Sequence, residues 1–195
     1  MTAATLPTNP APWNATPRFI GFGIDATPAL GGVTQRIARL GSRWSVTLDF
    51  PAVTGQYAGA FRAALIKARS SGSTIRVRWP QAGLRDFGKP LVNGATQTGF
   101  ALACDAFTGG TIPAGTFFSF EVSSRSYLYQ ISDDISIVSG SASLPISPMI
   151  RVSPADNTAL QFSPIIEGWL SGNDQEWTFE RIAWEGFQIT VTEAE

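Results

Sequence analysis

The strongest constraint on the fold lies in residues 33–80, where alternating strands flank one helical pattern. Apolar side chains occupy every second position over residues 44–50, and this period of two predicts a strand with one apolar face. Pro51 ends the strand because proline has no N–H for a ladder. Residues 55–69 carry apolar side chains at helical spacing, and residues 75–79 alternate again. The pattern predicts a β-scaffold covered by a single helix.

The predicted helix has a clear apolar stripe. Its expected buried positions are Tyr57, Phe61, Leu65 and Ala68. Charged side chains at other positions lie off this line, which is typical of a helix that packs one face on a sheet. We therefore expect this stripe to contact the apolar face of the neighbouring strands.

The middle of the chain is expected to be wholly β. Residues 86–150 contain several short apolar runs separated by glycine and proline turns, a spacing that favours a small barrel or sandwich. Asn93 and Gly94 form the strongest hairpin signal in the chain. We interpret this segment as a small inserted β-domain.

The ends of the chain complete the predicted organisation. Three alternating runs near residues 166–170, 177–181 and 187–191 predict strands that return to the first sheet. The first domain is therefore expected to be discontinuous, a split-barrel or sandwich-like unit formed by residues 17–85 and 151–195. Residues 1–16 are rich in proline and alanine and are expected to form an extended arm.

Composition limits the classes of function. Hydrophobic residues make up 44% of the chain and charged residues only 15%. The low share of charged residues favours a surface that contacts other protein chains. The formal net charge of −1 gives no support for nucleic-acid binding. No secretory signal and no membrane-spanning helix are expected. Cys104 is the single cysteine, which excludes an intramolecular disulfide and fits a reducing cytoplasm.

Motifs for catalysis are weak. The chain has no histidine, which removes the Ser-His-Asp and Cys-His constellations and most zinc sites. Residues 83–89 match the phosphate loop G-x-x-x-x-G-K, but Pro90 lacks the hydroxyl that holds magnesium and disfavours a helix start. We interpret this segment as a linker. Cys104 follows an apolar run and is expected to be buried and inert. No catalytic residue, cofactor or metal site is predicted.

Carboxylates leave an enzyme as an alternative. Two carboxylates can hydrolyse a glycosidic bond, and the candidates are Glu121, Glu167, Asp174, Glu176 and the pair Asp133 and Asp134. Adjacent residues on a strand point to opposite faces, so Asp133 and Asp134 are interpreted as a solvated turn.

Aromatic and basic residues are candidates for contacts between subunits. Trp13 on the arm and Trp184 in a loop-like segment could act as exposed anchors. Such aromatic residues also stack on sugars, so a carbohydrate-binding domain for host attachment is an alternative interpretation of the chain. The arginine candidates, which could pair with carboxylates of a neighbouring subunit, are Arg36, Arg39, Arg43, Arg76 and Arg78.

The order of several short motifs resembles that of bacteriophage tail-tip proteins of the distal tail type. These motifs are G-x-R-W at 41–44 with Pro51 and the helix, Leu-Val-Asn-Gly at 91–94, Gln-Thr-Gly at 97–99, Leu-Pro-Ile-Ser-Pro at 144–148 with Arg151, Pro-Ala-Asp at 154–156, and a strand at Phe162. The resemblance covers roughly residue 34 to the C-terminus.

The resemblance implies a structural role in a phage tail. It implies a homo-oligomeric ring, usually a hexamer, that joins the tail tube to the baseplate or tip in the virion. Tail tube, tape-measure and tip or hub proteins would be its neighbours, with assembly in the host cytoplasm. A glycan-binding domain and a glycan-degrading tail enzyme remain the alternatives.

Overall fold

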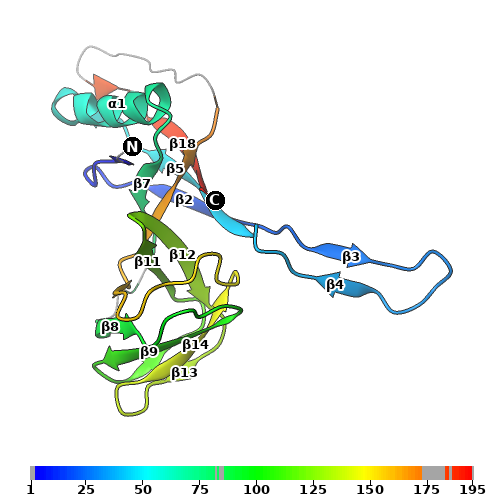
Figure 1. The fold of residues 1–195 in the computed structure, drawn as a ribbon. Coiled ribbons are helices and arrows are strands. Elements are labelled where there is room, and N and C mark those ends of the chain that lie inside the picture. The colour runs from blue at the N-terminus through cyan, green and yellow to red at the C-terminus, as the bar shows by residue number, and fades with distance from the viewer. Residues whose placement is uncertain (1–2, 82, 84–85, 173–182, 185, 195) are drawn as a thin grey trace.

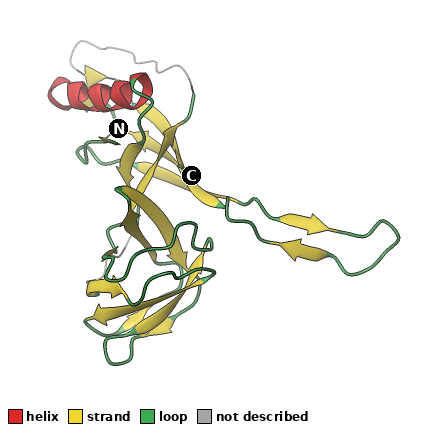
Figure 2. Ribbon diagram, in the orientation of Figure 1, coloured by secondary structure: helices red, strands yellow, loops and turns green. Residues whose placement is uncertain are grey.

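The computed structural model describes residues 3–81, 83, 86–172, 183–184 and 186–194. As predicted, the described chain is mainly β with one helix, arranged as a helix-covered sheet and a small barrel (Figures 1 and 2). A two-stranded ribbon extends from the first sheet, away from both bodies (Figure 1). No helix in the described part of the chain is long and apolar enough to cross a membrane.

The first sheet has six strands from both halves of the chain. In spatial order they are β1 (Ala4–Thr5), β7 (Ile75–Arg78), β16 (Ile165–Leu170), β18 (Phe187–Glu193), β5 (Arg43–Phe50) and β2 (Asn14–Ile20). Strand β1 pairs in parallel with β7, and the other pairs are antiparallel. This sheet unites segments on either side of the middle of the chain.

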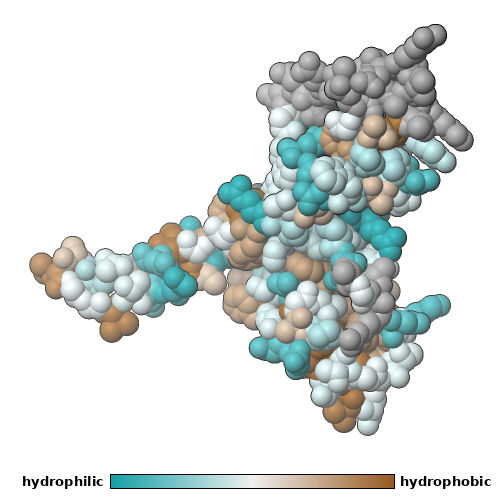
Figure 3. Space-filling view, turned by 180° about the vertical axis from the view of Figure 1, so that it is seen from behind, coloured by the Kyte–Doolittle hydropathy of each residue, from teal (hydrophilic) through white to brown (hydrophobic). Residues whose placement is uncertain are grey.

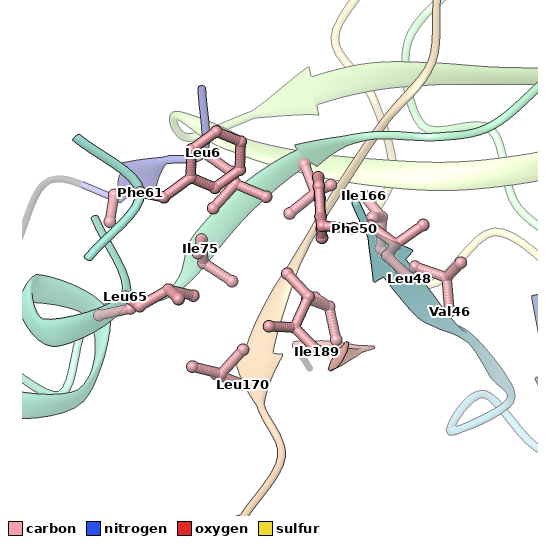
Figure 4. Packing of buried hydrophobic residues seen from close by; sticks show 14 of the residues in the cluster. Leu6, Val46, Leu48, Phe50, Phe61, Leu65, Ile75, Ile166, Leu170 and Ile189 are labelled. Carbon is pink, nitrogen blue, oxygen red and sulfur yellow. The ribbon is translucent and has the colours of Figure 1, made fainter. Parts of the chain in front are cut away.

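Helix α1 (Gly55–Ser70) covers one face of this sheet. Phe61 and Leu65 are fully buried against apolar side chains of the strands (Figure 4). The prediction for Tyr57 was wrong, because its side chain is 40% exposed and Ala58 takes the buried position. Ala58 lies three residues before Phe61, a spacing that also keeps it on the packed face.

The two faces and the edge of the first sheet differ in chemistry. Facing the helix are Val46 and Leu48, which are fully buried, while hydroxyl side chains bond across the other face. On that face, the hydroxyl oxygens of Thr47 and Thr190 are hydrogen-bonded at 2.9 Å. Edge strand β2 has Pro17 near its centre, opposite Val46.

The second sheet forms a nearly closed six-stranded barrel. Its strands in spatial order are β15 (Leu160–Gln161), β11 (Phe117–Val122), β12 (Arg125–Ile131), β14 (Ala142–Ser147), β9 (Ala101–Phe107) and β8 (Gly88–Val92). A bridge between Leu91 and Ala159 brings the two edges together. Because β15 belongs to this sheet, the barrel continues beyond residue 150, where we placed the end of the inserted segment.

Three short strand pairs complete the fold. They are β3 (Ile24–Ala26) with β4 (Gln35–Ile37), β6 (Val53–Thr54) with β17 (Ala183–Trp184), and β10 (Thr111–Ile112) with β13 (Ile135–Ser136). Trp184 thus lies in a paired strand rather than in the predicted loop. The strand predicted over 177–181 lies outside the described residues.

Two other predicted segments adopt more specific structures. Residues 1–16, predicted to be an extended arm, supply β1 and the start of β2, so the first sheet holds this segment at both ends. Asn93 and Gly94 follow β8, but the chain continues to residue 100 before β9 begins. The Gln97 side chain holds this longer loop, donating to the Asn93 carbonyl and accepting from the Ala103 N–H.

Candidate assembly interface

A two-stranded ribbon projects from the first sheet (Figure 1). Residues 21–42 extend the β2–β5 pair outward through β3 and β4 (Figure 1). Almost every residue of this segment is exposed. The large apolar side chains exposed here are Phe22, Ile24, Leu30, Val33, Ile37 and Leu40. Figure 3 shows hydrophobic residues at the tip of the ribbon and near its base.

The paired part of the ribbon has two unlike faces. Ile24 is directly opposite Ile37, and these side chains share one face. Asp25 is opposite Arg36 on the other face, and their side chains form an ion pair at 2.8 Å. The Arg36 hydrogen bond lowers the pKa of Asp25. Arg36, a candidate for pairing with another subunit, thus has a carboxylate partner within the ribbon, and its side chain is 82% exposed.

Aromatic contacts anchor the base of the ribbon. The rings of Phe19 and Trp44 meet edge to face with centroids 5.0 Å apart. The Arg43 guanidinium lies 4.9 Å from the centre of the Phe22 ring, a cation–π contact. Arg39, another of the arginine candidates, is exposed between β4 and β5. The three arginines are therefore spread along the ribbon rather than gathered in one site.

The remaining interface candidates lie on the first sheet and on the β6–β17 pair. Trp13 is 75% exposed, and its backbone N–H donates to the Asp49 carbonyl at 3.0 Å. Arg76 and Arg78 share one face of β7, with Arg78 the more exposed. The backbone of Trp184 pairs with Val53. Of the described side chains, Arg78 lines one pocket and Trp13 lines another.

Arg76 binds two of the carboxylates considered for catalysis. Its Nε donates to Glu167 at 2.7 Å, and its Nη1 lies 3.0 Å from Glu121. Glu167 is 3% exposed and also accepts from the Thr74 hydroxyl and the Ser126 N–H. Because the Glu167 carboxylate accepts all of these hydrogen bonds, it links β7, β16 and β12, and we assign it a structural role. Glu176 and Asp174 lie outside the described residues.

A second buried carboxylate, Glu193, joins the first sheet to the barrel. It accepts from the N–H of Trp44 at 3.2 Å and of Leu128 at 2.8 Å, and it forms an ion pair with Arg151. Both side chains of the pair are buried. Burial raises the pKa of Glu193, while Arg151 and the two N–H donors oppose that rise. Three segments far apart in the sequence meet at this carboxylate.

Apolar packing reinforces this junction. Phe117 of the barrel lies 5.0 Å from Trp44 and 4.9 Å from Trp79, measured between ring centroids. Leu128, also from the barrel, is fully buried in the core of the first sheet. The two bodies therefore share a core as well as two buried carboxylates, which fixes how the barrel is mounted on the sheet.

The other chemical motifs are structural where they are described. Lys89 and Pro90 lie in strand β8, so no helix follows the phosphate-loop match. Asp133 and Asp134 are exposed after β12, as predicted for a turn, and Asp134 accepts from the Ala114 N–H at 2.8 Å. Within the described ranges, no group of three or more acidic or cysteine side chains is placed to hold a metal ion.

Cys104 should be unreactive in the folded protein. It is 2% exposed in β9, and burial raises the pKa of its thiol to about 12. Because the thiolate is the reacting species, we expect no labelling by Ellman's reagent at pH 8 and one equivalent after unfolding in guanidinium. Rapid labelling of the native protein would contradict the burial of this side chain.

The most exposed apolar residues escaped sequence reasoning. Leu30 and Val33 flank Gly31 and Gly32, and two apolar residues around a glycine turn are too few to form a periodic pattern. One sequence feature could have indicated the ribbon tip: residues 26–35 carry no charged side chain and lie between two segments that can pair as strands. Glu193 and Arg151 gave no local signal, because their contact joins positions far apart in the sequence.

No protein-family model matches this sequence, and no curated protein matches it either. Function is therefore inferred from the residues and geometry described above, together with the resemblance in motif order.

Proposed function

We propose that this chain is a structural subunit of a phage or phage-like tail tip. Copies of it form a closed hexameric ring that joins the tail tube to the baseplate or tip. The observation that carries the proposal is the ribbon of residues 21–42, which exposes apolar side chains on both strands. An isolated two-stranded ribbon is marginally stable in water, so contact with another chain would stabilise it.

The buried charges support a scaffold rather than a catalyst. Glu167, Glu193 and Arg151 are buried, and their contacts join the first sheet to the barrel. A rigid mount of this kind suits a protein that holds its neighbours in fixed positions. By resemblance, those neighbours are the tail tube, tape-measure and hub proteins.

Mass and location test this proposal directly. We expect light scattering of the purified chain at tens of micromolar to give a single multiple of the subunit mass, with rings visible by electron microscopy. A tagged copy should map to the tail tip of purified particles. A monomer at this concentration, together with absence from tails, would refute the proposal.

A carbohydrate-binding role is the second candidate, favoured by the surroundings of Trp13. This exposed ring adjoins a shallow pocket that also contains Asp49 and Gln188. The Asp49 carboxylate accepts from Asn14 at 2.8 Å and from Gln188 at 2.6 Å. An aromatic plate beside amides and a carboxylate suits a sugar ring, so Trp13→Ala should abolish glycan-array binding if this role is real.

A further inference from the structure

The ribbon tip and an apolar groove lie beyond opposite ends of the same strand pair. Strand β2 runs from Asn14 beside the groove to Ile20 at the base of the ribbon, and β5 returns from Arg43 to Phe50. The ribbon continues outward from the Ile20 end of these strands, while the N-terminal segment lies near their opposite end (Figure 1). The tip therefore points away from the groove of its own chain.

The groove has a volume of about 490 Å³ and is mostly apolar. The N-terminal segment forms one wall with Leu6, Pro7 and Pro12, and the ends of β5 and β7 contribute Phe50, Val77 and Trp79. Among the described residues that line it, Arg78 is the one with a charged side chain. Apolar side chains entering this groove would therefore displace water from apolar walls and meet little fixed charge.

The tip has matching chemistry. Leu30 is fully exposed and Val33 is 91% exposed, so neither side chain is covered by its own chain. Residues 26–35 contain no charged side chain. Gly31 and Gly32 have φ values of 85° and 148°, which favour glycine and turn the chain tightly between the two apolar residues. The tip, residues 26–35, is thus an uncharged apolar knob. Docking this knob in the groove would not incur the cost of removing a charged side chain of the knob from water.

We infer that the tip of one copy, through Leu30 and Val33, docks in the groove of the next copy. This inference rests on the proposed function and identifies the contact that closes the ring. Because knob and groove are different surfaces at opposite ends of one strand pair, the contact is head to tail. Repetition of such a contact closes into a ring when its rotation divides a full turn.

Cysteine cross-linking of the full-length chain tests this contact. Leu30→Cys combined with Ala11→Cys, or with Thr8→Cys, places one thiol on the tip and one in the groove lining. Cys104 is buried and would not compete. We expect mild oxidation to give a ladder of covalent multimers on non-reducing gels. A control pair, Leu30→Cys with Val138→Cys on an exposed part of the barrel, should give no such ladder.

A tip variant separates the inference from the proposed function. Leu30→Glu should leave the melting temperature unchanged, because this side chain makes no buried contact, and should weaken self-association by at least tenfold in mass measurements. Rings that form without tip-to-groove cross-links would overturn the inference and leave the proposed function standing. Equal cross-linking of the control pair would also overturn it. Failure of the wild-type chain to form any oligomer, alone or in particles, would overturn both.

Discussion

Glu193→Gln should lower the free energy of unfolding by about 3–5 kcal/mol, the usual cost of breaking a buried ion pair on one side. The change leaves the guanidinium of Arg151 buried without its counter-charge. The carboxylate now accepts hydrogen bonds from the Arg151 guanidinium and from the N–H groups of Trp44 and Leu128. In the variant, the amide NH2 group would face one of these donors and could not accept its hydrogen bond. Small domains are stable by about 5–15 kcal/mol, so this loss would be visible in any unfolding curve.

Chemical denaturation of the wild-type chain and three variants measures the effect. Glu121→Gln is the matched control, because Glu121 also pairs with an arginine but its side chain is 39% exposed, and its loss should cost at most about 1 kcal/mol. Glu193→Leu with Arg151→Met removes both buried charges and should recover part of the stability. Unchanged stability of Glu193→Gln would mean that the carboxyl group is already protonated in the folded protein.

Phe61→Asp should destabilise the first sheet by at least about 4 kcal/mol. Truncating a buried phenylalanine alone costs about 3–5 kcal/mol, and the new carboxylate adds the cost of burying a charge. Phe61 is fully buried and lies edge to face with Phe50 and Phe187, at 5.2 and 5.7 Å between centroids. We expect the variant to be largely unfolded at 37 °C.

The same helix offers a matched control on its other side. Ile66 is 46% exposed, so Ile66→Asp introduces the same charge without emptying the core. Its melting temperature should stay within a few degrees of the wild type, a change of about 1 kcal/mol at most. Equal melting temperatures for the two variants would mean that the packed face of α1 is misassigned.

Local periodicity was sufficient to predict helix α1 and the strands β5 and β7 on either side of it, but not the strands β1 and β2 that the N-terminal segment supplies. Val46, Leu48 and Phe50 alternate, and each is buried facing α1. Such patterns are readable because neighbouring positions decide which face of a strand is apolar. Strand spacing placed residues 151–195 with the first sheet, whereas Leu160 and Gln161 pair with β11 in the barrel.

Contacts between distant segments were beyond local patterns. Glu167 was noted as a carboxylate available for sugar chemistry, but its partners Arg76 and Ser126 lie in other strands. Leu128 sits in a barrel strand and yet fills the core of the first sheet. In the ribbon, the mixed sequence around Ile24 and Ile37 predicts pairing poorly, because neither strand has a face buried by its own chain.

Pro17 on the edge of β2 restricts how copies of this chain can join. An exposed edge strand can extend into a neighbouring molecule through backbone hydrogen bonds, and such growth has no natural end. A proline within the edge interrupts the row of N–H donors and discourages that growth. Association at this edge must then depend on side chains that fit a particular surface, and such contacts stop once each surface is occupied. A particle built this way would have a fixed number of subunits, and an excess of free chain in the cell would stay dispersed instead of forming fibres.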